Sequence, residues 1–188
     1  MTLETCFKRF NYLVEYQVYI DGNNVAYTNY TKDSKPLLSN IVNLISHLIE
    51  KIGFFRNNII CICDPSLRYY IDKPSEFKML VKEGVIFEAP KVADEMILSF
   101  ALKHEFCFII SNDRFKEYID QLPSKKWLEE RRVPFMIIRD NITISPNVDY
   151  RKIDLLPDNE NVSHQEKEIT TLKVLENIEK IKGELDLY

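Results

Sequence analysis

Four short apolar segments of this chain each run into an aspartate. They are "VYID" ending at Asp21, "CICD" at Asp64, "FIISND" at Asp113 and "MIIRD" at Asp140. Their β-branched and aromatic residues favour buried strands. Because helical patterns separate the segments, the sequence predicts an α/β fold, a three-layer α/β/α sandwich with a mostly parallel central sheet. Right-handed crossovers give such strands one direction, so we expect the aspartates at one edge of the sheet.

Hydrophobic periodicity predicts where the strands and helices lie. Strands are expected at residues 18–21, 58–64, 85–90, 105–111 and 133–140. Helices are expected at residues 36–53, 74–84, 91–104, 114–122 and 125–132. The first helix has the clearest pattern, because its leucines and isoleucines recur on one face, Pro36 suits its first turn and Gly53 its end.

The chain is long enough for one good core, with 188 residues of which 45% are hydrophobic. We expect one domain over residues 1–150, followed by residues 151–188 as a linker and a C-terminal helix. Apolar residues recur at helical spacing in that last segment. It is expected to dock on the domain or to associate with a second copy, which would give a homodimer.

Charge and cysteine content limit the function classes. A formal net charge of -4 argues against coating nucleic acid through overall positive charge, so any such contact needs a local basic patch. The four cysteines show no metal-site spacing, which indicates reduced core residues. No apolar stretch approaches the length of a membrane span, and no signal-peptide pattern begins the sequence. We therefore expect a cytoplasmic protein without membrane contact.

The acidic residues predict a metal site if they converge. Asp94 and Glu95 begin a helix that leads directly into the strand before Asp113. Two carboxylates about 4 Å apart repel by roughly 4 kcal/mol at an effective dielectric constant near 20, more than the ~1 kcal/mol of a helix cap. A cluster of Asp21, Asp94 and Asp113 would therefore need protons or cations. Oxygen ligands without histidine favour Mg²⁺ or Mn²⁺, which suit phosphoryl chemistry.

Each acidic residue also has a structural explanation. Asp21, Asp64 and Asp140 each precede a residue typical of turns. Asp113 can cap the following helix as well as bind a metal. Glu95 is rotated by about 100° from the preceding aspartate on a helix, so the two do not share a direction.

Three segments in order, "VYIDGNNVAY", "ADEMILSFAL" and "FIISNDRFKEYI", are followed by "WLEERRVPFMIIRDNITISP". Together they resemble the ribonuclease domain of the NYN branch of PIN-like nucleases, and in particular the regnase type. The resemblance covers residues 17–147 and implies a PIN-like, Rossmann-like topology. It also implies Mg²⁺-dependent endonucleolytic cleavage of single-stranded or loop RNA.

The resemblance implies roles for individual residues. Asp21 matches the first metal ligand of the family, and Asp94 and Asp113 match further acidic positions of the site. Glu95 stands where regnases usually have a second aspartate, and we include it in the catalytic set. Asn24, Asn112 and Glu117 match family positions and are expected to support this set, and Asp64 is expected to support it because of its place at a strand end. The glutamates at 95 and 117 leave open whether the full set is active.

Basic residues lie near these acidic positions along the chain. Those expected to bind RNA phosphates are Lys91, Arg68, Arg114 and Lys116. A further basic run occupies residues 125–132, where interleaved glutamates make a solvated helix face an equally simple explanation.

Three functions compete. A metal-dependent endoribonuclease explains the joint presence of Asp21, Asp94 and Asp113. A PIN-like module that binds RNA or a protein partner without cutting agrees with the negative net charge and with the glutamate at 95. A haloacid-dehalogenase-like phosphatase also has an aspartate at a strand end, but it requires a second aspartate two residues later, where this chain has Asn23.

Overall fold

A parallel five-stranded sheet forms the centre of the computed structural model, which describes residues 16–29, 34–138 and 141–144. Its strands are β1 (Gln17–Asp21), β2 (Ile59–Cys63), β3 (Ile86–Glu88), β4 (Cys107–Ile110) and β5 (Arg132–Val133). The order is β3-β2-β1-β4-β5, and every neighbouring pair is parallel. The predicted parallel sheet is confirmed. Because the chain builds outward from β1 to β3 and then returns to the other side of β1, the strand order reverses between β1 and β4, where α/β sheets form their ligand crevices.

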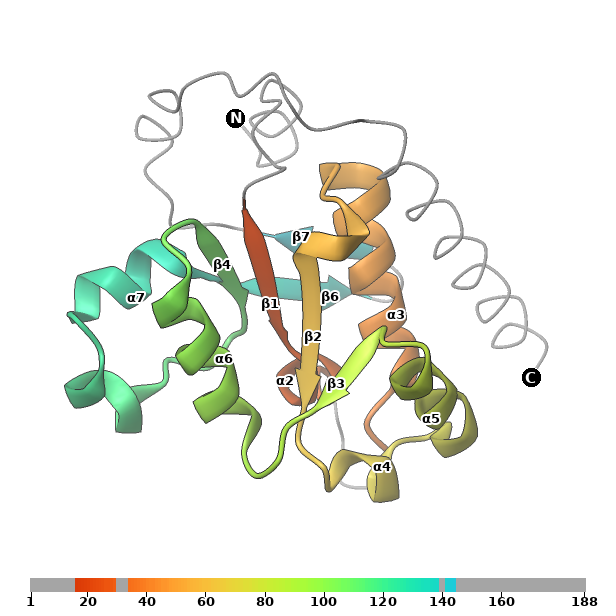
Figure 1. The fold of residues 1–188 in the computed structure, drawn as a ribbon. Coiled ribbons are helices and arrows are strands. Elements are labelled where there is room, and N and C mark those ends of the chain that lie inside the picture. Colours follow the sequence, from red (N-terminus) through yellow and green to blue (C-terminus); the bar gives the residue numbers. More distant parts are fainter. Residues whose placement is uncertain (1–15, 30–33, 139–140, 145–188) are drawn as a thin grey trace.

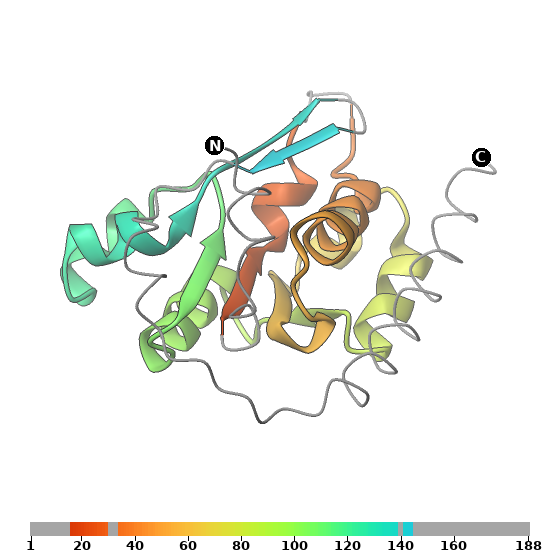
Figure 2. The same cartoon turned by 90° about the horizontal axis from the view of Figure 1, so that it is seen from above.

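Helices cover both faces of this sheet, which confirms the predicted three-layer sandwich (Figures 1 and 2). On one face lie α3 (Leu38–His47), its continuation η2 (Leu48–Ile52), and α5 (Pro74–Lys82). On the other lie α6 (Ala93–Lys103), η4 (Lys116–Gln121) and α7 (Lys125–Arg131). The strand β1 shows why two cores form: Val18 and Ile20 pack with α3, whereas Tyr19 between them packs with α6.

Most of the predicted helices are present with shifted ends. The helix expected at 36–53 begins at Leu38 and ends in a π-helical turn, after which Gly53 adopts a left-handed conformation with φ of 97°. Short helices that the periodicity did not predict follow strand ends, namely α2 (Gly22–Ala26) and α4 (Leu67–Tyr70), and η3 (Arg56–Asn58) precedes β2. The helix expected at 114–122 is shorter: it is the 3₁₀ helix η4, which begins only after Phe115, whose left-handed φ of 47° cannot belong to a helix.

The prediction of one buried strand over 133–140 is wrong. The strand β5 ends at Val133, and after Pro134 the chain forms β6 (Phe135–Ile138), which pairs antiparallel with β7 (Asn141–Ile144). Proline has no N–H to continue the parallel ladder, so the chain leaves the sheet there. Figure 2 shows this hairpin extending away from the parallel sheet. Asp140 and the segment expected to form a linker and helix after residue 150 lie outside the described residues.

Among the described residues, no helix combines the length and apolar character that crossing a membrane requires.

Gly22 allows the first turn of α2 to lie directly against β2. A Cβ atom at Gly22 would lie 2.2 Å from Sγ of Cys63, which is closer than side chains approach, and 3.0 Å from Sγ of Cys61, which is a tight contact. We predict that Gly22→Ala lowers the free energy of unfolding by about 1–3 kcal/mol, the usual cost of overpacking a core, as measured by chemical denaturation. The same substitution made in a Cys63→Ala background should cost less, because the contact atom is gone. An equal cost in both backgrounds would contradict this explanation.

Candidate active site

Asp21 is held rigidly at the end of β1. Its side chain is only 3% exposed. The backbone N–H of Asn24 donates to Oδ1 over 3.0 Å, which caps α2, and the hydroxyl of Ser111 donates to Oδ2 over 2.7 Å. The carboxylate is therefore fixed by one hydrogen bond from its own turn and one from the end of β4.

Two neighbouring amides bind the end of β1 to the strands on either side. The amide nitrogen of Asn23 donates to Oδ2 of Asp64, whose backbone N–H donates back to Oδ1 of Asn23, each over 2.8 Å. On the other side, the backbone N–H of Asn112 donates to Oδ1 of Asn24 over 2.9 Å. These hydrogen bonds hold together the carboxyl ends of β2, β1 and β4.

Asp64 also determines where α6 begins. The N-terminal residue of this helix, Ala93, donates its backbone N–H to Oδ1 of Asp64 over 2.6 Å. Val92 at the N-cap position of α6 provides no side-chain acceptor, so Asp64 supplies the cap from another element. This contact brings Asp94, in the first turn of α6, to the edge of the sheet where Asp21 lies.

The loop after β4 carries Asp113 to the same edge. Its backbone N–H donates to Oγ of Ser111 over 3.0 Å, and its Oδ1 accepts from the backbone N–H of Phe115 over 2.7 Å. The ring of Phe115 is buried in the core beneath α6. Phe115 has a left-handed backbone conformation, which is uncommon for a bulky residue. Strained conformations of this kind often occur at functional sites. The side chain of Asn112 also fixes the loop: its amide nitrogen donates to the backbone carbonyl of Phe135, and its Oδ1 accepts from the backbone N–H of Phe135.

The carboxylates are close enough to act on one another's ionisation. We call Asp21, Asp64, Asp94, Asp113 and Glu117 the acidic cluster. Burial raises the pKa of Asp21 to about 6, and the charges of Asp113 and Asp64 contribute to the increase. Burial also raises the pKa of Asp94 to about 7 and is the largest cause of the increase. The charges of the other four members of the cluster raise it further. In the part of the chain that the structure describes, no lysine or arginine forms an ion pair with Asp21, Asp94 or Asp113.

The donor set of the acidic cluster fits a hard divalent cation. It consists of carboxylate oxygens, which Mg²⁺ and Mn²⁺ prefer. No three His, Cys, Asp or Glu side chains within residues 16–29, 34–138 and 141–144 are arranged to hold a metal ion by themselves. Mg²⁺ usually binds through one or two carboxylates and keeps several waters. Such an ion therefore needs no closed cage of protein ligands at this edge.

The structure separates Glu95 from Asp94, as the helical rotation predicts. Glu95 is exposed and lines a pocket between α6 and η4. Glu117, at the start of η4, contributes to the raised pKa of Asp94 and so lies near it. The catalytic role of Glu95 stays a prediction.

The basic residues expected to bind RNA differ in their surroundings. Lys91 is exposed just before α6. Arg68 forms a bidentate ion pair with Glu88 at the end of β3, which occupies its guanidinium. Arg114 and Lys116 are exposed and line one pocket beside α7. Their contacts with RNA stay predictions.

Asn23 was missed as a site residue. The signal was present, because two successive amides directly after a strand-end aspartate are more than a turn requires. Asp64, which was expected to support the site, has a specific structural role because it caps the N-terminus of α6.

A parallel sheet of order β3-β2-β1-β4-β5 with carboxylates at its switch point defines a PIN-like α/β domain. A family model described as the Zc3h12a-like Ribonuclease NYN domain matches residues 14–155. The chain belongs to this family, which confirms the regnase-type resemblance of its motifs. A sequence comparison with curated proteins gives no match.

Two solved structures of the nuclear protein-only RNase P 2 (PRORP2) from Arabidopsis thaliana are similar to this fold. One is 18% identical with a TM-score of 0.57, and the other is 19% identical with a TM-score of 0.56. The alignments cover 78% and 79% of this chain but 33% and 34% of those chains, so it spans about a third of their length. At this identity the likeness shows the fold alone.

The raised pKa values predict how stability changes with pH. Asp94 binds its proton more tightly in the folded protein, where its pKa is about 7, than in the unfolded chain, where the pKa is about 3.9. In metal-free buffer the free energy of unfolding should therefore fall as the pH rises from about 4 to about 7. Asp94→Asn should melt at a higher temperature than the wild type at pH 8, and the difference should vanish near pH 4.

Glu105→Gln is the matched control, since Glu105 is exposed before β4, at the opposite end of the sheet. It should follow the wild-type pH profile. A lower melting temperature of Asp94→Asn at pH 8 would mean that the carboxylate stabilises the fold.

Proposed function

We propose that this chain is a metal-dependent endoribonuclease that hydrolyses phosphodiester bonds of single-stranded or loop RNA. One observation carries the proposal. Carboxylates from three separate segments meet at the switch point of the sheet: burial together with the charge of Asp113 raises the pKa of Asp21, and burial together with the charges of Asp21 and Asp113 raises the pKa of Asp94. Such repulsion is typical of sites that bind cations or hold protons for chemistry.

In this proposal one or two of the carboxylates of Asp21, Asp94 and Asp113 would bind Mg²⁺ or Mn²⁺ directly, and the rest would contact the waters of the ion. A bound ion of this kind would lower the pKa of the attacking water and neutralise charge on the scissile phosphate. The residues of the chain provide rigidity, because Ser111 and the backbone of Asn24 fix the two oxygens of Asp21. In the metal-free protein the pKa of Asp94 is raised to about 7, so a cation bound there would displace its proton near neutral pH.

A basic groove beside the acidic cluster supports RNA as the substrate. It has a volume of about 760 Å³ and lies between η4 and α7. Its basic residues are Arg114, Lys116, Lys125, Lys126 and Arg132. Arg132 also donates to the carbonyl oxygen of Ser111 over 3.2 Å, which connects the groove to the loop that bears Asp113.

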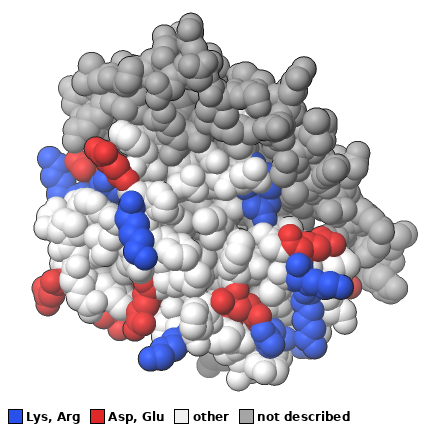
Figure 3. All heavy atoms as spheres, viewed as in Figure 1, with Lys and Arg blue, Asp and Glu red and all other residues white. Residues whose placement is uncertain are grey.

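Two glutamates partly neutralise this basic groove. Lys125 and Lys126 form ion pairs with Glu129 and Glu130 one turn later on α7. Surface pairs of this kind are worth only ~0.3–0.5 kcal/mol, so phosphates of RNA are able to replace them. Figure 3 shows that basic and acidic side chains are interspersed over the face seen in Figure 1. Binding through a local groove is therefore compatible with the net charge of -4.

We predict that Asp21→Asn and Asp113→Asn each reduce metal-dependent cleavage at least about 100-fold, because each removes a negative charge that holds the ion directly or through its waters. The measurement is gel analysis of a 5′-labelled single-stranded RNA in Mg²⁺ or Mn²⁺, with EDTA as the blank. Glu105→Gln should cut at the wild-type rate. RNA retention without internal cuts by the wild type would instead identify a binding module.

The basic groove should contribute to affinity in a salt-dependent way. We predict that Lys116→Ala weakens RNA binding at low salt and reduces the slope of log K against log salt by about 0.7, the value for one phosphate contact with a single strand. Fluorescence anisotropy in the Asp113→Asn background measures this without cleavage. Lys78→Ala, an exposed lysine on α5, should leave affinity and slope unchanged. Equal slopes for both variants would exclude Lys116 from the RNA path.

A further inference from the structure

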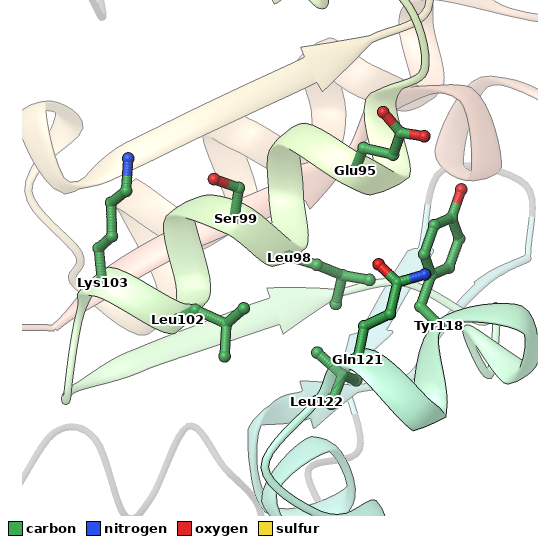
Figure 4. A pocket seen from close by; sticks show the side chains of 8 residues that line it. All are labelled: Glu95, Leu98, Ser99, Leu102, Lys103, Tyr118, Gln121 and Leu122. Carbon is green, nitrogen blue, oxygen red and sulfur yellow. The ribbon is translucent and has the colours of Figure 1, made fainter.

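A second pocket opens on the other side of η4, against α6 (Figure 4). It measures about 520 Å³, within the range of small-ligand pockets. The lining residues that matter here are Glu95, Leu98, Leu102, Tyr118, Gln121 and Leu122. Figure 4 shows the ring of Tyr118 and the carboxamide of Gln121 beside each other on η4, with Glu95 on the first turn of α6 above them. The pocket therefore combines apolar walls with a few polar groups.

The 3₁₀ geometry of η4 explains why this short helix serves two different surfaces. With three residues per turn, Tyr118 and Gln121 share one face. Lys116 and Ile119 share another face and line the basic groove.

The pocket borders the acidic cluster. Tyr118 directly follows Glu117, and Glu95 directly follows Asp94. The charges of Asp94, Glu95 and Glu117 also act on the hydroxyl of Tyr118 and, after burial, help to raise its pKa. A phosphate bound at the acidic cluster would therefore have its neighbouring base within reach of the pocket.

The chemistry of the lining suits a nucleobase. Tyr118 packs against the core beneath α6 and is only partly buried, so part of its ring is available for stacking. Leucines favour a flat apolar group, the carboxamide of Gln121 offers a donor and an acceptor, and the carboxylate of Glu95 accepts from base N–H groups. At the end of the pocket that borders the acidic cluster, the carboxylate of Glu95 repels a phosphate, which argues against the RNA backbone there; Lys103, which also lines the pocket, lies at the opposite end of α6.

We infer that this pocket receives one nucleobase of the RNA adjacent to the scissile phosphate, with Tyr118 stacking on the base and Gln121 and Glu95 contacting its edge. The inference rests on the proposed nuclease function. It makes Tyr118 and Gln121 specificity-determining residues, which select the site of cleavage without taking part in the chemistry.

Sequencing the products from an RNA pool of random sequence tests this directly. The wild type should show a base preference at one position beside the cut. Tyr118→Ala should flatten that preference and lower kcat/KM on the preferred sequence about tenfold, the loss expected for one stacked base. Gln121→Ala, which removes an edge contact, should also flatten the preference. Cutting of the least preferred sequence should stay within about twofold of wild type. Gln121 is exposed, so its replacement leaves the core unchanged.

Two control variants separate stacking from other effects. Tyr118→Phe keeps the ring and should keep the base preference. Tyr70→Ala removes an exposed tyrosine on α4, 59% accessible, and should also leave the preference intact. An unchanged preference in both Tyr118→Ala and Gln121→Ala, or a loss of preference in Tyr70→Ala alone, would overturn the pocket assignment while leaving the nuclease proposal in place.

Fluorescence anisotropy tests whether the pocket binds a base, and it does so without RNA cleavage. In the Asp113→Asn background, Tyr118→Ala should weaken binding of the preferred RNA about tenfold relative to the least preferred RNA. Equal weakening of both RNAs would overturn the inference. Absence of metal-dependent cleavage by the wild type would overturn the nuclease function instead, and the inference that rests on it.

Discussion

Repulsion between carboxylates at one end of a parallel sheet is the constraint on which the rest of this structure depends. Asp21 is buried, and Asp94 is partly buried beside four other acidic side chains. Neither gains an ion pair in the part of the chain that the structure describes. The unfavourable charge must be held in place by other interactions, since a flexible loop would move the carboxylates apart. Neutral hydrogen-bonding groups perform this role, which leaves the negative charge available to a cation.

The stretch "DGNN" at residues 21–24 combines these tasks in four residues. The aspartate supplies charge, the glycine allows close contact with Cys63, and the amides of Asn23 and Asn24 bind the ends of β2 and β4. Through Asp64 the same set of contacts reaches the start of α6. The position of Asp94 therefore depends on Asn23, although the two residues are far apart in the sequence.

The sequence predicted the strands, the parallel sheet and the acidic edge because these follow from local patterns. Apolar runs with β-branched residues identify buried strands, and parallel crossovers place their ends together. Pro134 is the exception: the apolar run around it continues, but the missing N–H directs the chain into a separate hairpin. The helical pattern after Asp113 likewise did not reveal the left-handed Phe115 or the 3₁₀ form of η4. The cap of α6 by Asp64 and the two surfaces of η4 depend on contacts between distant segments, which no local pattern contains.

The most direct test of this account is anomalous diffraction from crystals of the wild-type protein grown with Mn²⁺. We predict an anomalous peak at the carboxyl end of β1 and β4, in contact with carboxylate oxygens of the acidic cluster and lost in Asp21→Asn crystals. A peak elsewhere, or no peak at this edge at saturating Mn²⁺, would contradict the claim that these carboxylates are brought together to hold a divalent cation.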